Sequence, residues 1–185
     1  MRNSDEQRLF ELVKQRSFRR GKFILASGAE SELYFNLKPT MMFPEGALLW
    51  AKAFLACILR SGVDYIGGLE MGAVPVLGAI AALSAMEGHA VNTFFARRQA
   101  KDHGTKDVIE GLAANESLSG KRVMVLDDVA TSGGSILKAA QAVRGAGAIV
   151  ELALVLIDRE EGAVEALKRQ GIALSSVFRG NEFLQ

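Results

Sequence analysis

The chain has 185 residues, enough for one domain with its own core, and its 49% hydrophobic and 23% charged residues are typical of globular proteins. Its 22 basic residues nearly balance 21 acidic ones, and the resulting net charge of +1 argues against nucleic acid as a partner. No apolar run approaches the ~20 residues of a membrane span, no signal-peptide core follows the charged start, and the single cysteine, Cys57, excludes an internal disulfide. We therefore expect a cytoplasmic protein without a membrane partner, in which Cys57 is a core residue.

The first part of the chain is predicted to contain one helix and two short strands. Apolar residues spaced along one helical face, with Ser4 as a candidate N-cap, predict an amphipathic helix over residues 4–15. Two strands, 23–25 and 33–37, are expected on either side of a turn at 27–31.

From residue 44 onward, helical and strand patterns alternate. Pro44 suits the first turn of an apolar helix that continues over 47–59 and ends at Ser61 and Gly62. The elements expected next are strand 63–67, an Ala-rich helix ending near 86, strands 91–96 and 123–126, helix 136–143, strand 149–157, helix 162–170 and strand 172–177. With no linker and no internal repeat, this order predicts a single α/β domain over 1–185, built on a doubly wound parallel sheet.

Three loops are expected to carry the function, because ligands of such sheets bind at the carboxyl ends of the strands. They are 67–72, 97–106 and 127–135, each of which follows a predicted strand. The first belongs to a glycine-rich run, G-G-L-E-M-G-A-V-P at 67–75.

The stretch 123–135, V-M-V-L-D-D-V-A-T-S-G-G-S, is the most informative one in the chain. A buried strand is predicted to end at Asp127 and Asp128, after which three hydroxyl side chains and two glycines lead into a helix. The N–H groups and positive dipole end of such a helix can hold a phosphate, while neighbouring carboxylates accept hydrogen bonds from vicinal hydroxyls or lie near a metal ion. A ligand with both groups is a ribose 5-phosphate. The alternative is a solvated turn and an ordinary helix cap.

This order of residues closely resembles the phosphoribosyl diphosphate (PRPP) binding motif of the type I phosphoribosyltransferases, and its spacing differs from that of P-loop and Rossmann motifs. The resemblance implies that Asp127 and Asp128 hold the ribose hydroxyls and that 131–135 anchors the 5′-phosphate. The PRPP-binding residues it implies after the acidic pair are Val129, Ala130, Thr131, Ser132, Gly133, Gly134 and Ser135.

Residues 97–106, R-R-Q-A-K-D-H-G-T-K, combine four basic residues and a histidine with a glycine and no helical spacing. This composition is typical of a cation-rich lid, although a charge run can also be a solvated face. The run resembles the catalytic loop of the orotate phosphoribosyltransferases, with Arg98 where a lysine is common. The resemblance implies that four residues cover the pyrophosphate of PRPP: Arg97, Arg98, Lys101 and His103. The catalytic residues it implies are Arg98, Lys101, His103, Asp127 and Asp128.

Segment 23–35 resembles the N-terminal hood of the same enzymes, so residues 1–43 are expected to form a small hood. The resemblance implies that Tyr34 and Phe35 pack on the orotate ring, the alternative being that they simply fill a strand. Two departures from the family stand out. Ala26 replaces a base-contacting lysine of some relatives, and Met71 stands where many relatives have a lysine, next to Glu70 in the loop that wraps pyrophosphate.

Arg159 follows the predicted strand 149–157 and matches the position of the base-binding arginine of these enzymes. A planar guanidinium can meet the carboxylate of orotate with two charge-assisted hydrogen bonds. The resemblance implies that Thr131 lies at the base as well. The alternative is a surface arginine paired with Glu160 or Glu161.

As a whole, the resemblance implies orotate phosphoribosyltransferase activity, in which orotate and PRPP give orotidine 5′-monophosphate and pyrophosphate in de novo pyrimidine (UMP) synthesis. It implies Mg²⁺ as cofactor, bound mainly through PRPP, and a homodimer in which each lid, 98–106, is shared across the interface. Two alternatives remain: a phosphoribosyltransferase for another base, and a PRPP-sensing regulator that binds nucleic acid. The balanced charge disfavours the second.

Overall fold

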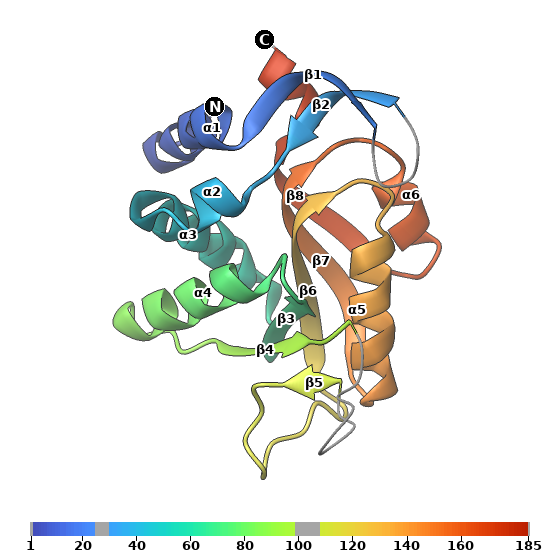
Figure 1. Ribbon diagram of the computed structural model, residues 1–185. Helices are drawn as coiled ribbons and strands as arrows, with labels where there is room; N and C mark the ends of the chain where they lie inside the picture. Colours follow the sequence, from blue (N-terminus) through green and yellow to red (C-terminus); the bar gives the residue numbers. More distant parts are fainter. Residues whose placement is uncertain (1, 25–29, 99–107, 185) are drawn as a thin grey trace.

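The structure is a computed structural model that describes residues 2–24, 30–98 and 108–184 (Figure 1). Its centre is a six-stranded sheet in the order β5-β4-β3-β6-β7-β8. The strands are β3 (Tyr65–Leu69), β4 (Asn92–Ala96), β5 (Ile109–Glu110), β6 (Arg122–Ala130), β7 (Ile149–Asp158) and β8 (Ala173–Arg179). All neighbours pair in parallel except β4 and β5. The predicted α/β fold with a parallel sheet is confirmed.

Helices lie on both faces of this sheet, so its apolar central strands are buried from two sides (Figure 1). On one side are α3 (Pro44–Ser61) and α4 (Val74–Met86), and on the other are α5 (Gly134–Gly145) and α6 (Ala163–Lys168). Two buried hydrophobic clusters correspond to these two sides. The sheet is therefore doubly wound, as predicted. Within the described ranges, every helix is too short or too polar to cross a membrane.

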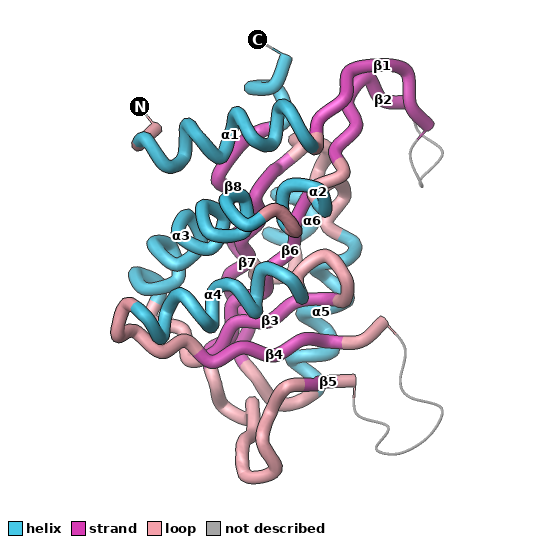
Figure 2. The backbone as a smooth tube through the Cα atoms, turned by 60° about the vertical axis from the view of Figure 1, so that its left-hand side comes forward, coloured by secondary structure: helices cyan, strands magenta, loops and turns pink. Residues whose placement is uncertain are grey.

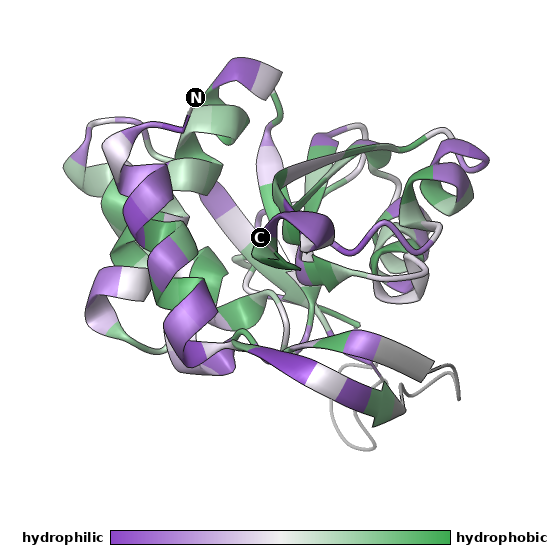
Figure 3. Ribbon diagram, turned by 90° about the horizontal axis from the view of Figure 1, so that it is seen from above, coloured by the Kyte–Doolittle hydropathy of each residue, from purple (hydrophilic) through white to green (hydrophobic). Residues whose placement is uncertain are grey.

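The N-terminal part adds α1 (Ser4–Arg16), a hairpin of β1 (Phe18–Ile24) and β2 (Glu30–Phe35), and the short helix α2 (Lys38–Met41). Figure 2 shows the hairpin projecting beyond the sheet, and in Figure 3 the hairpin carries both hydrophilic and hydrophobic residues. Helix α1 belongs to the core, because Phe10 stacks on Phe183 of the C-terminal 3₁₀ helix (Gly180–Leu184) with ring centroids 4.2 Å apart. That residues 1–43 act as a hood stays a prediction.

Some boundaries differ from the predicted ones. Asn3 rather than Ser4 caps α1, because the Asn3 side chain accepts a hydrogen bond from the N–H of Glu6, whose own side chain accepts one from the N–H of Asn3. Strand β3 lies two residues later than predicted, and α5 begins at Gly134. The edge strand β5 and the 3₁₀ helix were not predicted, since elements of two to five residues leave little periodic signal.

The most consequential difference concerns β6, which was predicted to end at Leu126, before the two acids. It continues to Ala130, because its parallel register with β7 runs on until Ala130 pairs with Asp158. Both acids of the central motif are therefore held by strand geometry rather than by a loop.

Candidate active site

Three loops meet at the carboxyl ends of the parallel strands. One follows β3 and contains Gly72, one follows β4 and includes Arg98, and one follows β6. The first loop touches the end of β6, because a Cβ atom built on Gly72 would clash with Oδ1 of Asp127 and lie 3.2 Å from Oδ1 of Asp128. It is also hydrogen-bonded to the second loop, through Glu70 and Arg98. In the described residues, the loops therefore gather as predicted.

Asp127 and Asp128 form an acidic pair near the end of β6, in which Asp127 is buried and Asp128 is half-buried. Asp127 is 6% exposed, and its Oδ1 accepts a hydrogen bond from the N–H of Asp128 at 3.0 Å, while Oδ1 of Asp128 accepts one from the N–H of Val129 at 2.9 Å. Burial, reinforced by the charge of Asp128, raises the pKa of Asp127 to about 7, and burial also raises the pKa of Asp128. Asp127 is thus partly protonated near neutral pH, and a ligand that favours the carboxylate would remove this proton.

Two cations act against this effect of burial. While burial raises both pKa values, Arg98 favours the charged form of Asp127 and Lys38 favours that of Asp128. Lys38 is the first residue of α2, so the N-terminal part of the chain contributes a positive charge to the acidic pair.

The loop after β6 leads into a helix end suited to an anion. Gly133 has a φ of 82°, in the left-handed region that favours glycine, and α5 starts at the next residue, Gly134. Among the described residues, no side chain caps this helix start. The first N–H groups of a helix have no partner within it, so they can bind a phosphate. Ser132 is exposed beside them, and Thr131 and Ser135 are half-buried.

The two arginines after β4 have different partners. Arg98 forms two hydrogen bonds with Glu70: its main-chain N–H donates to Oε1 of Glu70, and its Nε donates to the main-chain oxygen of Glu70, both at 3.0 Å. Arg97 lies near Glu110 of β5, with 3.7 Å between Nη1 and Oε1. Two predicted site residues of the same segment lie outside the described residues: Lys101 and His103.

Arg159 directly follows β7, and its side chain is 5% exposed. Its main-chain N–H donates to the oxygen of Ala130 at 2.9 Å, which places it beside the loop that begins at Thr131. Its Nη2 pairs with Oε1 of Glu161 at 2.6 Å. The partner is thus one of the two named in the alternative to base binding, but the burial does not fit a surface arginine. Base binding by Arg159 stays a prediction.

Tyr34 and Phe35 lie on opposite faces of β2, as neighbours along a strand must. Tyr34 is 40% exposed and stacks on Phe23, with ring centroids 5.1 Å apart. Phe35 packs on Phe18 and Phe183, each with centroids 5.1 Å apart, against the hydrophobic core. The structure therefore gives Phe35 a packing role and leaves Tyr34 accessible, and contact of either with orotate stays a prediction.

Comparisons with known proteins identify the family. Residues 48–174 match the phosphoribosyl transferase domain. The orotate phosphoribosyltransferase of Bradyrhizobium sp. (strain ORS 278) is 49% identical over 183 residues, 99% of either chain, and that of Rhodopseudomonas palustris (strain BisB5) is 50% identical over 183 residues, 99% of this chain and 98% of the relative. The crystal structure of Mycobacterium tuberculosis H37Rv orotate phosphoribosyltransferase in complex with PRPP is 28% identical, with a TM-score of 0.78 over 98% of this chain and 99% of that one. The chain belongs to the orotate phosphoribosyltransferases.

Within this orotate phosphoribosyltransferase fold, three contacts of the site were not predicted from the sequence. They are the approach of Lys38 to Asp128, the hydrogen bonds between Glu70 and Arg98, and the pairing of Arg97 with a glutamate of β5. Each joins residues from different elements or loops, so spacing along the sequence carried no signal of it. The glycine of the loop after β3 was the one available hint, because a glycine allows close approach of the backbone to a neighbour.

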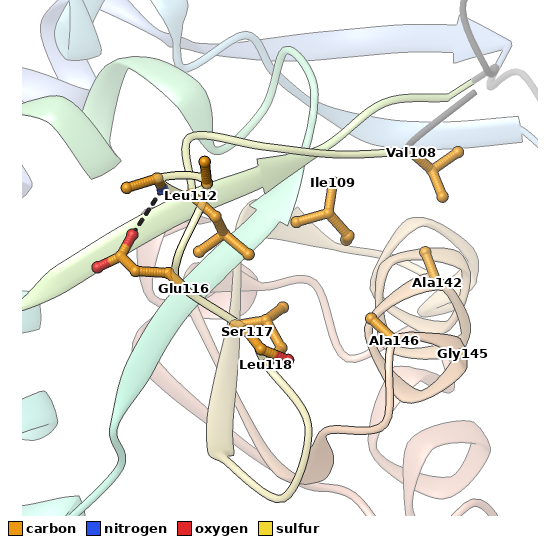
Figure 4. A pocket seen from close by; sticks show the side chains of 11 residues that line it. Val108, Ile109, Leu112, Glu116, Ser117, Leu118, Ala142, Gly145 and Ala146 are labelled. Carbon is orange, nitrogen blue, oxygen red and sulfur yellow. Dashed lines mark hydrogen bonds between the residues drawn. The ribbon is translucent and has the colours of Figure 1, made fainter. Parts of the chain in front are cut away.

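A hollow lies away from this site, between the loop after β5 and the C-terminal half of α5 (Figure 4). Its volume is about 690 Å³, and Leu112, Leu118 and Ala146 are among its lining residues. Glu116, at its wall, accepts a hydrogen bond from the N–H of Ala113 at 2.7 Å. None of the predicted orotate phosphoribosyltransferase site residues that the structure describes lines this hollow.

Proposed function

We propose that this chain catalyses the transfer of a phosphoribosyl group from PRPP to orotate, which gives orotidine 5′-monophosphate and pyrophosphate in de novo pyrimidine synthesis. It would thus act as a pentosyltransferase. The observation that carries the proposal is the acidic pair of buried Asp127 and half-buried Asp128, shortly ahead of an uncapped helix start, in a chain that matches curated orotate phosphoribosyltransferases over 99% of its length.

The ribose and phosphate side of the site follows from this pair and from α5. Breaking the bond between the anomeric carbon and pyrophosphate builds positive charge on the sugar and negative charge on the leaving group. Asp127 and Asp128 accept hydrogen bonds from the ribose hydroxyls and lend negative charge beneath the developing cation. The N–H groups of 131–135 hold the 5′-phosphate and so fix the anomeric carbon for in-line attack by the ring nitrogen. Orotate is already an anion, so no strong general base is needed.

The leaving-group side is built from cations. Arg98, held by Glu70 next to the loop after β3, supports this assignment among the described residues. We assign the same role of neutralising the pyrophosphate to Arg97, Lys101 and His103 on the basis of the family resemblance. A site closed to water would strengthen each of these charge interactions.

Recognition of orotate is assigned to Arg159, Thr131, Tyr34 and Phe35. The support for Arg159 is its burial beside the loop at Thr131 together with a charge suited to a carboxylate. The support for Tyr34 is its exposed ring. Because Phe35 packs against the core, its part would be to hold the strand that carries Tyr34.

Magnesium is proposed as the cofactor, carried into the site by PRPP. In the described part of the chain, no group of three or more His, Cys, Asp or Glu side chains is placed to hold a metal ion. Mg²⁺ commonly takes only one or two carboxylates together with phosphate oxygens of a substrate. The oxygens of a diphosphate and of ribose hydroxyls are the hard ligands that Mg²⁺ prefers. Bound in this way, the ion would neutralise charge on the diphosphate.

A homodimer that shares its lids, 98–106, across the interface is also proposed. Besides the family resemblance, its support is the exposed apolar side chains of the packed helices α3 and α4: Leu48 and Leu59 are 45% and 46% exposed, and Met86 is 86% exposed. Mixing inactive Lys101→Ala with inactive Asp128→Asn tests lid sharing, because some hybrid dimers would contain one intact composite site. Recovered activity is expected. No recovery, with subunit exchange confirmed by mass spectrometry, would count against sharing.

The proposed setting is the cytoplasm, with orotate and PRPP as small-molecule partners and with neither nucleic acid nor membrane as a partner. Its support is the net charge of +1 and the single cysteine, which suits a reducing compartment.

The test of the proposed function is an assay of the purified protein with Mg²⁺, PRPP and a panel of bases. We expect PRPP-dependent loss of orotate absorbance and little reaction with uracil, adenine, guanine or hypoxanthine. A preference for one of the other bases would replace orotate as the substrate. PRPP binding without transfer to any base would favour a regulator.

A further inference from the structure

Glu70 is an unexpected residue for its position. It lies in the loop after β3, the loop that the family resemblance places against pyrophosphate, where a carboxylate would repel the ligand. Its carboxylate is already engaged, since Oε1 accepts a hydrogen bond from the main-chain N–H of Arg98 at 3.0 Å. The contact is reciprocal, because Nε of Arg98 donates to the main-chain oxygen of Glu70, also at 3.0 Å.

These two hydrogen bonds fix both parts of Arg98. The side chain of Glu70 holds the main chain at residue 98, and the main chain of Glu70 holds the guanidinium. The anchor itself is firm, because the N–H of Glu70 donates to the oxygen of Ala96 at 2.9 Å, at the end of β4. Without this arrangement, the long and exposed Arg98 side chain would occupy many rotamers.

The same loop reaches the acidic pair. Gly72, two residues after Glu70, lies so close to Oδ1 of Asp127 that a Cβ atom there would clash with it. The loop therefore lies between Arg98 on one side and Asp127 on the other, which sets the guanidinium relative to the acids that would hold the ribose.

We propose that Glu70 is a positioning residue, which acts through Arg98 by holding it beside the acidic pair, where the pyrophosphate leaves. This inference rests on the proposed function and deepens it. Glu70 touches neither substrate, and its negative charge is offset by the guanidinium that it places. Its contribution is the reach of its side chain, that is, a length sufficient to bring a carboxylate oxygen to the N–H of residue 98.

Three substitutions separate reach from charge. Glu70→Gln keeps an oxygen at the same reach and removes the charge, Glu70→Asp keeps the charge and shortens the reach, and Glu70→Ala removes both. If Glu70 positions Arg98, the Gln variant stays within about threefold of the parent kcat/KM for PRPP, while the Asp and Ala variants both lose about tenfold to a hundredfold, the scale of a small misplacement of a catalytic group. If only charge matters, the Asp variant resembles the parent and the Gln variant resembles Ala, which would overturn the proposal.

A double-mutant cycle with Arg98→Ala tests whether Glu70 works through Arg98. In that background, Glu70→Ala should lower kcat/KM by less than about twofold further, because the group that it positions has gone. Losses that multiply independently would contradict the proposal. As a matched control, Glu116→Ala removes another carboxylate that accepts a main-chain N–H, from Ala113, away from the site, and its kcat/KM should stay within about twofold of the parent.

Binding of magnesium pyrophosphate, measured by calorimetry on the full chain, provides a readout that does not need orotate turnover. The affinity should fall in the Asp and Ala variants and persist in Gln. If the parent binds pyrophosphate but turns over no orotate, the proposed function fails while the positioning role is still tested by this series. If the parent binds pyrophosphate and the Asp, Ala and Gln variants bind it equally well, the positioning role fails and the proposed function stands. Thermal melting of each variant checks that it is folded.

Discussion

The two halves of the site are built in different ways. The half assigned to ribose and 5′-phosphate is one continuous stretch, in which strand β6 supplies an acidic pair with a buried first member and the next helix supplies N–H groups. The half assigned to pyrophosphate is assembled from two separate loops that meet through Glu70 and Arg98, a partly buried and an exposed residue. Rigid elements suit the part of a substrate that stays in place during the reaction, and loops suit the part that must leave.

The largest effect should come from the pyrophosphate half. Lys101→Ala is expected to lower kcat by about two orders of magnitude or more, because an electrostatic group that meets the leaving group in the transition state stabilises it more than the ground state. Steady-state kinetics with orotate and PRPP measures this. Lys168→Ala, on the exposed side of α6, is the control. An unchanged kcat with a raised KM would instead assign Lys101 to ground-state binding.

The second effect concerns the base. Arg159→Met keeps much of the side-chain bulk and removes the charge, so KM for orotate should rise by roughly 10- to 150-fold, which corresponds to ~1.5–3 kcal/mol for a hydrogen bond to a charged group. KM for PRPP should change little. Arg169→Met, which alters an exposed arginine, is the matched control. If the orotate KM is unaffected while the protein remains folded, the ion pair of the buried Arg159 with Glu161 is purely structural.

The same contrast explains how much could be predicted from the sequence. The acids at 127 and 128, the hydroxyl-rich loop and the alternating elements were predictable because each is encoded by neighbours in the chain. The continuation of β6 through Asp127 was not, because it depends on the register with β7. Lys38 was missed for a similar reason, since only the folded chain brings α2 towards Asp128. The packing of Phe35 on Phe183 could not be predicted either, because it joins β2 to the C-terminal 3₁₀ helix.

The third prediction tests the junction of the two halves. Gly72→Ala should lower stability by about 1–3 kcal/mol, the usual cost of overpacking, and reduce kcat/KM for PRPP, because the added methyl group must push the loop away from Asp127. Gly78→Ala is the matched control. It lies in α4 with nothing within 4 Å of its Cβ position, so it should stabilise the protein by about 0.5–1 kcal/mol. Urea unfolding measures the free energy of unfolding of both variants. If Gly72→Ala is as stable as Gly78→Ala, the loop accommodates the added methyl group without strain.

The smallest effect concerns the stability of the acidic pair. Burial, with the charge of Asp128, raises the pKa of Asp127 to about 7 in the folded protein, well above the ~3.9 of an unfolded aspartate. The folded state therefore binds this proton more tightly, so the contribution to stability is fully present below about pH 4 and is lost as the pH rises through about 7. Asp127→Asn removes the titration and keeps an oxygen that can accept the N–H of Asp128.

At pH 8 the Asn variant should thus be more stable than the parent by about 1–2 kcal/mol, less than the full shift implies because the buried NH₂ group of asparagine needs hydrogen-bond partners of its own. The difference should shrink towards pH 4, where the parent carboxyl is protonated as well. Urea unfolding at pH 4.5, 6, 7 and 8 measures it. Asp5→Asn, at a half-exposed carboxylate that pairs with Lys52, should show no gain at pH 8. A parent and an Asp127→Asn variant of equal stability at every pH would mean that the buried pair bears no unfavourable charge, and the ribose half of the site would then be as well solvated as the pyrophosphate half.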